Sequence, residues 1–153
     1  MSALIDETMW STLDLGRKVE KASAAITGIS TKTIFTIVGG RVNIAALVAE
    51  VATTNLQGQA NAMTIDVDPT VGAAGALATG IETNGAAIGT TFSITGNPAD
   101  AAIKNTGVAT GCKQPCILPA GIITYATAAS STGELKWTIW YKPVDVGAYI
   151  EAA

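Results

Sequence analysis

The stretch Glu-Leu-Lys-Trp-Thr-Ile-Trp-Tyr-Lys, residues 134–142, decides the fold class of this chain. Its bulky apolar side chains recur at every second position, and these are Leu135, Trp137, Ile139 and Tyr141. Alternation with a period of two predicts a β-strand with one buried face. Pro143 follows and should end the strand, because proline has no backbone N–H to donate. We therefore expect Trp137 in a core and Trp140 on the opposite face of the strand.

Weaker signals of the same kind recur along the chain at a spacing of roughly ten residues. They lie at 32–38, 42–51, 62–67, 90–95 and 122–127, with turn residues between them. The Ala-rich run at 42–51 also fits a helix, but its β-branched residues and the glycines before it favour a strand. About eight short strands predict an all-β fold, an antiparallel β-sandwich or jelly roll.

Local signals also predict how some segments connect. Gly39-Gly40 lies between two apolar runs and predicts a hairpin. The run at 42–51 is apolar on both faces, which suits a sandwich centre or a subunit interface. Small residues with Asn84-Gly85 predict short strands and tight turns over 70–90. Asn97 and Pro98 predict a helix of at most two turns, because asparagine caps a helix and proline fits its first position.

Residues 1–16 differ in composition from the β body at 17–153, which we expect to be a single domain. Ser2 could cap a short helix with apolar residues on one face. The alternative is an arm that lies on a neighbouring subunit. Either way, the apolar side chains of this segment need a partner surface. Together with one outward tryptophan of the 134–142 strand, the interface candidates are Ile5, Met9, Trp10, Leu13 and Trp140.

Composition and charge exclude several classes of function. The 153 residues are 48% hydrophobic and only 14% charged, with a net charge of −3. An acidic balance argues against nucleic acid as a partner, since phosphates need a basic patch. The chain has no histidine, which removes Ser-His-Asp and Cys-His catalysis. The most apolar window, 42–52, is shorter than the roughly 20 residues of a membrane helix, so we expect neither a membrane span nor a secretory signal.

Two acids and two cysteines leave alternatives open. Asp66 and Asp68 project to one side of a strand, about 7 Å apart, and could bind a divalent cation with other oxygens. The alternative, a polar end of a strand, is favoured.

Cys112 and Cys116 could close a short disulfide loop, whereas two free thiols are the favoured interpretation. No base is available to activate Cys112.

The aromatic residues of the 134–142 strand suggest one further site. Trp137, Trp140 and Tyr141 could form a sugar-stacking face, although a core side and a subunit contact are favoured. No paired carboxylates with an aromatic cleft and no phosphate-binding loop are visible. We therefore expect no enzyme activity, no catalytic residues, no cofactor and no metal.

Several segments resemble small structural proteins of tailed bacteriophages, in particular capsid decoration (cement) proteins. They are LIDE at 4–7, KVEK at 18–21, FTIVGGRV at 35–42, FSITG at 92–96, STGELKWTIWYKP at 131–143, DVGA at 145–148 and AA at 152–153. The resemblance implies a β-sandwich or jelly-roll subunit on the outer surface of a virion, often a homotrimer, that locks neighbouring major capsid proteins together. The alternative function is a tail or fibre β-domain, or a carbohydrate-binding module.

Overall fold

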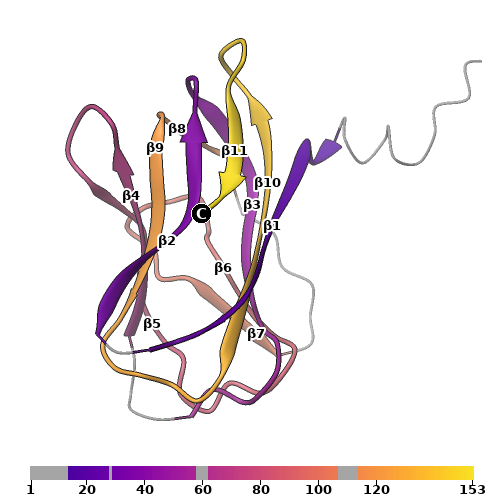
Figure 1. Cartoon of the computed structure of the whole chain (residues 1–153), viewed down its shortest axis with the longest axis vertical. Coiled ribbons are helices and arrows are strands. Elements are labelled where there is room, and N and C mark those ends of the chain that lie inside the picture. The colour runs from indigo at the N-terminus through magenta and orange to yellow at the C-terminus, as the bar shows by residue number, and fades with distance from the viewer. Residues whose placement is uncertain (1–13, 28, 58–61, 107–113) are drawn as a thin grey trace, which may run out of the picture.

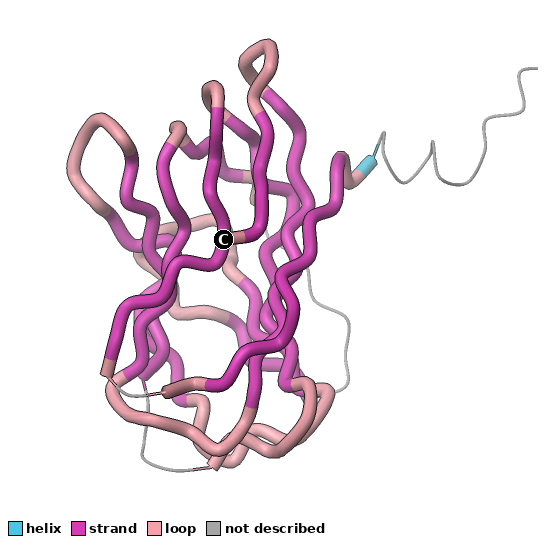
Figure 2. Tube along the Cα trace, in the orientation of Figure 1, coloured by secondary structure: helices cyan, strands magenta, loops and turns pink. Residues whose placement is uncertain are grey.

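The computed structural model describes residues 14–27, 29–57, 62–106 and 114–153. Within these residues, eleven strands form two antiparallel sheets that face each other as a β-sandwich (Figure 1). Loops gather at the two ends of the sandwich (Figure 2). The all-β prediction is therefore confirmed, while the jelly-roll subtype stays a prediction.

We name the two sheets A and B. Sheet A has the order β1 (Arg17–Ala25), β10 (Glu134–Pro143), β3 (Val42–Val51), β6 (Thr90–Ser93) and β7 (Ile103–Thr106), and β8 (Cys116–Leu118) also pairs with β3. Sheet B has the order β11 (Tyr149–Ala152), β2 (Ser30–Val38), β9 (Gly121–Thr127), β4 (Ala62–Pro69) and β5 (Gly75–Glu82). The expected strands therefore exist, and β4–β5 and β6–β7 pair with their neighbours in sequence, whereas β1, β2 and β3 have main partners far along the chain.

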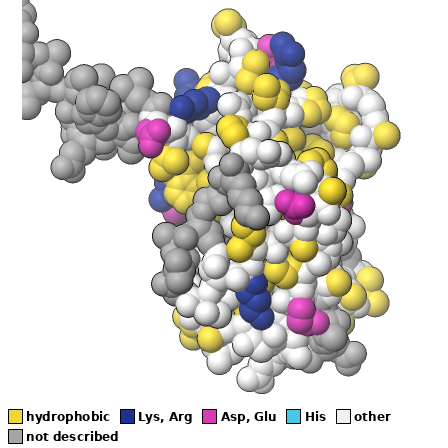
Figure 3. Space-filling model, turned by 180° about the vertical axis from the view of Figure 1, so that it is seen from behind, with side chains coloured by type: hydrophobic (Ala, Val, Ile, Leu, Met, Phe, Trp, Pro, Cys, Tyr) yellow, Lys and Arg dark blue, Asp and Glu magenta, His cyan; other side chains and the backbone are white. Residues whose placement is uncertain are grey.

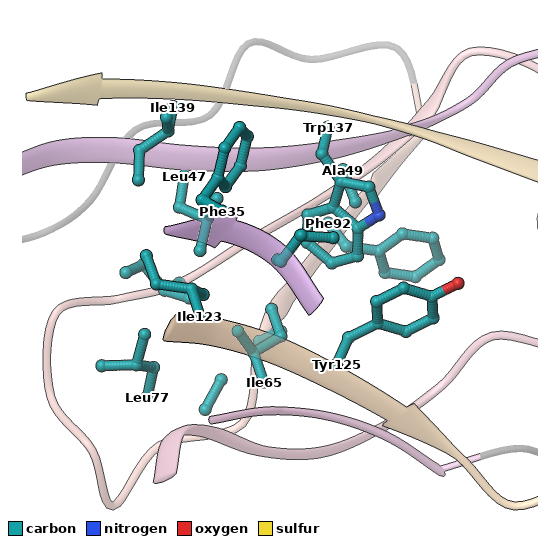
Figure 4. Close-up of a cluster of buried hydrophobic side chains, with 14 of the residues drawn as sticks. Phe35, Leu47, Ala49, Ile65, Leu77, Phe92, Ile123, Tyr125, Trp137 and Ile139 are labelled. Carbon is teal, nitrogen blue, oxygen red and sulfur yellow. The ribbon is translucent and has the colours of Figure 1, made fainter. Parts of the chain in front are cut away.

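The core lies between the sheets and is filled by the inward side chains of both (Figure 4). Trp137 of β10 is only 2% exposed, as the alternation in this strand predicts. Phe35 from sheet B and Phe92 from sheet A are fully buried in the same core. Strand β3, between β10 and β6, is buried on its inner face and half-buried on much of its outer face. The strand assignment at 42–51 is thus confirmed, and the helix alternative is wrong.

The predicted hairpin at Gly39-Gly40 is wrong. Strand β2 pairs with β9 and β11 in sheet B, whereas β3 pairs with β10 in sheet A. The two glycines carry the chain across from one sheet to the other, and Gly40 has a φ of +147°. A side chain at Gly40 would collide with Asp145 of the loop between β10 and β11. The glycine pair therefore serves a crossing between layers, which local sequence does not distinguish from a hairpin turn.

The predicted helix after Asn97 is also wrong. Asn97 does accept a hydrogen bond from the backbone N–H of Ala99, at 3.3 Å, so its capping chemistry is present. The turn closes with the Asp100 N–H donating to the Asn97 carbonyl at 3.1 Å, and the chain then enters β7. Residues 103–106 instead pair with β6 as a strand, and this pairing replaces the predicted helix there. Between 70 and 90, one strand, β5, precedes the Asn84-Gly85 turn.

No helix within the described ranges has the length and apolar character to cross a membrane.

Candidate interaction surface

Only one of the five interface candidates lies within the described residues. Ile5, Met9, Trp10 and Leu13 belong to the segment 1–13, outside that part of the chain. Trp140 lies half-buried on the outer face of sheet A, opposite Trp137. Its position on that face is confirmed, and its role at an interface stays a prediction.

The neighbours of Trp140 combine apolar and charged groups. In the register of sheet A, Trp140 is paired with Lys18 of β1 on one side and Ala46 of β3 on the other. The Lys18 ammonium lies 6.0 Å from the centre of the Trp140 ring, at the outer limit of a cation–π contact. Ala46 is only 8% exposed, so this side of Trp140 lies against a covered position of β3. Trp140 therefore presents a ring surface next to a cation.

Toward the N-terminal half of β10, a row of ion pairs borders Trp140. Glu20 accepts from Lys18 at 2.9 Å and from Lys136 at 3.1 Å. These hydrogen bonds, first that of Lys18 and then that of Lys136, lower the pKa of Glu20 below its ordinary value. All three side chains are 41–51% solvent-exposed, so each pair adds little stability. The row forms a polar rim beside the tryptophan.

Beyond Trp140, toward the C-terminal end of β10, lies an apolar end of the sandwich that we call the end surface. It is formed by residues 15–19 and 140–149. Exposed apolar side chains lie on it beside charged ones, and yellow, dark blue and magenta atoms occur together at the top of Figure 3. Their exposed fractions are 42% for Leu15, 44% for Val144, 103% for Val146 and 41% for Tyr149. Scattered exposed apolar residues are ordinary, but a contiguous group marks an interaction site.

Two open grooves cross the end surface, each of about 460 Å³. The first groove is lined by residues 15–19 together with Trp140 and Tyr141. The second groove is lined by residues 143–149. Arg17 contributes to both grooves and so stands at their junction. The end surface can therefore hold one continuous, mainly apolar partner that passes a cation in its middle.

Gly16 fixes the start of β1 against β10 and so shapes the first groove. Its φ is +85°, and a Cβ at this position would collide with the carbonyl of Tyr141. Only glycine permits this backbone conformation at such a close approach. As a result Leu15, one residue earlier, lies on the wall of the groove that Trp140 also lines. Substitution of Gly16 would push the entry to β1 away from the end surface.

Arg41 and Asp145 hold the second groove in shape. Asp145 accepts from the Arg41 backbone N–H at 2.7 Å and from its side-chain Nε and Nη2 at 3.0 and 2.8 Å. In return, the backbone N–H groups of Val144 and Asp145 donate to the Arg41 carbonyl at 2.9 and 3.2 Å. The bonds from Arg41 lower the pKa of Asp145 to about 2. Val146 is thereby carried on a loop that is tied to the β2–β3 crossing.

The other sequence candidates do not assemble into a site within the described residues. Asp66 and Asp68 lie on the outward side of β4, where Asp66 accepts a hydrogen bond from the Thr64 hydroxyl at 3.2 Å. In the described part of the chain, no group of three or more acids, cysteines or histidines is placed to hold a metal ion. Cys116 lies in β8, whereas Cys112 falls in the segment 107–113, outside the described residues.

The sugar-stacking hypothesis fails for the three aromatic residues taken together. Trp137 and Tyr141 are each only 2% exposed and point into the core. Trp140 alone of the three reaches the surface. A platform that stacks on a sugar ring with all three side chains is therefore excluded, because alternate residues of a strand project to opposite faces.

Sequence reasoning missed most of the end surface. Val144 and Val146 follow Pro143, which ends the strand. The sequence of this segment predicts only a turn. A signal was present, since β-branched valines are unusual in a turn that also contains Asp145 and Gly147. Leu15, in turn, was grouped with the N-terminal arm and not with the body.

Comparison with known proteins gives no relative for this chain. No family model, no curated protein and no solved structure matches it.

Proposed function

We propose that this chain is a non-enzymatic structural protein of a phage virion, a decoration (cement) protein of the outer capsid. In this role it associates with itself, as a homotrimer, and binds the major capsid protein so that neighbouring shell subunits are held together. The proposal needs neither a nucleic acid nor a membrane as a partner. The sequence resemblance suggests the role, and the end surface is the observation that carries it.

The end surface supports the proposal because it combines apolar exposure with rigidity. Val146 is fully exposed, yet its loop is tied down by the bonds between Arg41 and Asp145. A preorganised apolar group loses little conformational freedom on binding, which favours association. Trp140 adds an aromatic side chain of the kind enriched at protein interfaces.

The low charge content supports the same role. Only 14% of the residues are charged, so large surfaces can be buried without the cost of desolvating many ions. The net charge of −3 suits an outer position better than one facing DNA. A sandwich of this kind has loops at both ends (Figure 2), so that one end can face a shell while the end surface meets a neighbouring copy.

Electron cryo-microscopy of the intact particle tests the proposal. Virions produced by the phage or prophage that encodes this chain would be purified and checked for the protein by mass spectrometry. We expect many copies per particle, with density for a β-sandwich on the outside of the capsid. The end surface should lie within contact distance of a neighbouring copy or of the shell.

Three results would contradict the proposal. Absence of the protein from purified virions would remove its structural role. Density on the tail or at a fibre would replace a capsid role with a tail role. Density on the capsid interior would exclude an outer decoration protein.

A further inference from the structure

The end surface carries an unsatisfied positive charge as well as apolar groups. Among the described residues, no carboxylate forms an ion pair with Arg17, although it stands where the two grooves meet. Asp145 also borders the second groove, but its carboxylate is already bonded to Arg41 through both oxygens. The grooves therefore suit a partner segment that is apolar and carries carboxylates of its own.

One segment of this chain has that chemistry. Residues 1–13 read Met-Ser-Ala-Leu-Ile-Asp-Glu-Thr-Met-Trp-Ser-Thr-Leu and contain two acids, Asp6 and Glu7, but no lysine or arginine. Ile5, Met9, Trp10 and Leu13 supply apolar side chains on both sides of the acids. The pairing of apolar groups with negative charge complements the grooves, where apolar walls flank Arg17.

We propose that the N-terminal arm of one copy, residues 1–13, lies in the two grooves on the end surface of a neighbouring copy, with Asp6 or Glu7 paired to Arg17. This inference rests on the self-association in the proposed function and names the segment and the surface responsible for it. It assigns Arg17 the role of orienting the arm, and Leu15, Trp140, Val144 and Val146 the role of binding its apolar side chains.

Chain geometry favours a neighbouring copy over the copy to which the arm belongs. The described chain begins at Asp14, and Leu15 already forms part of the first groove. An arm bound to its own grooves would have to reverse direction within a few residues of this point. Fully extended, 13 residues reach about 45 Å. A domain of this size is roughly 35–40 Å across, so the arm can reach the equivalent surface of an adjacent copy.

Exchange of arms in one rotational direction would give a closed ring. Each copy would donate one arm and accept one, which is a heterologous contact that closes when the rotation is a simple fraction of a turn. Three such exchanges produce a trimer in which every arm and every end surface is used. Several linked contacts also compensate for the ordering of each arm, which a single contact would offset only in part.

Exchange of charges tests the proposed pairing in the full-length protein. Arg17→Glu should lower the molar mass measured by light scattering from that of the oligomer toward that of the monomer. The double substitution Asp6→Arg with Glu7→Arg should do the same. The three substitutions together should restore the oligomer, because the complementary charges are restored in reverse. Lys104→Glu, on the distant edge strand β7, is the matched control and should leave the mass unchanged.

Photo-crosslinking locates the arm without a destabilising substitution. Benzoylphenylalanine at position 10, in place of Trp10, should crosslink to peptides containing residues 15–19 or 140–149. In a mixture of ¹⁴N- and ¹⁵N-labelled protein, crosslinked pairs of mixed label should appear. The same probe at Ile29, which is 82% exposed, is the control and should not react with these peptides.

Several outcomes would overturn the inference. They are a monomeric wild-type protein, an Arg17→Glu variant that keeps its oligomeric mass, failure of the combined variant to recover, and crosslinks that carry a single label or fall elsewhere. These results leave the virion role to be decided by microscopy of the particle. Conversely, an arm exchange found in a protein that is absent from virions would contradict the proposed function and not this inference.

Discussion

The rings of Tyr125 and Trp137 meet across the interior of the sandwich, 5.2 Å apart at their centres and tilted by 35° (Figure 4). Tyr125 comes from β9 in sheet B and Trp137 from β10 in sheet A, so this contact joins the two layers. Burial also raises the pKa of the Tyr125 phenol above its ordinary value. The stability of the sandwich should therefore depend strongly on this aromatic pair.

Trp137→Ala should lower the free energy of unfolding by about 3–5 kcal/mol, because it removes a large buried ring and leaves a cavity. This is a large share of the stability of an ordinary domain. Chemical denaturation followed by circular dichroism measures the loss. Unchanged unfolding would mean that Trp137 does not contribute to the core as its burial requires.

Trp140→Ala should have the opposite profile. Its side chain lies half-buried on the outer face of sheet A, so the melting temperature should change little compared with that of Trp137→Ala. Self-association or capsid binding should weaken, since the indole lines the first groove. Light scattering and sedimentation with capsids measure the two effects. A variant that assembles like the wild type would exclude Trp140 from the interface.

Asp145→Asn should make the stability of the folded protein less sensitive to acid. The pKa of Asp145 is lowered to about 2 from 3.8, first by the side-chain hydrogen bond of Arg41. A lowered folded-state pKa means that stability is present above the unfolded value near 3.8 and is lost as the pH falls toward 2. The free energies of unfolding of the wild type and the variant should therefore differ less at pH 2.5 than at pH 5. The same difference at both pH values would contradict a role for the Asp145 carboxylate in acid sensitivity.

Deletion of residues 2–13 should leave the β domain folded, because both sheets are formed by residues from Arg17 onward. Its circular dichroism should resemble that of the full chain, while trimerisation or capsid binding should weaken. Burial of the four apolar side chains of the arm would contribute on the order of 6–12 kcal/mol before ordering, and ordering would offset most of it. If the truncated chain fails to fold, the segment belongs to the core.

Removal of divalent cations should not affect folding. Two carboxylates, Asp66 and Asp68, form a weak site without further ligands. Thermal unfolding with and without EDTA should give the same melting temperature. A decrease of several degrees would show that an ion binds at this end of β4.

Sequence was sufficient where structure depends on a single strand. The alternation in 134–142 predicted which face of β10 is buried, and therefore the separate positions of Trp137 and Trp140. It was insufficient to predict which strands pair with one another. Gly39-Gly40 has the residue types of a hairpin turn, but the sheet that each flanking strand joins is decided by residues about a hundred positions away.

The same reasoning applies to the candidate surface. Trp140 was predicted as an interface residue because its strand has a second, outward face. The grooves were not, because they arise where the start of β1 meets the end of β10 and the loop at 144–148. Their shape depends on Gly16 and on the bonds between Arg41 and Asp145, which join parts of the chain without any local signal.

The pairing of β1 with β10 has a consequence for protein synthesis. Residues 17–25 leave the ribosome more than a hundred residues before their hydrogen-bonding partners, residues 134–141. Strand β2 likewise waits for β9 and β11. The nascent chain must therefore carry β1 and β2 unpaired until these partners are made, and exposed β edges can meanwhile join those of other chains. We expect slow folding, and a benefit from chaperones that shield β1 and β2 until β9, β10 and β11 have been made.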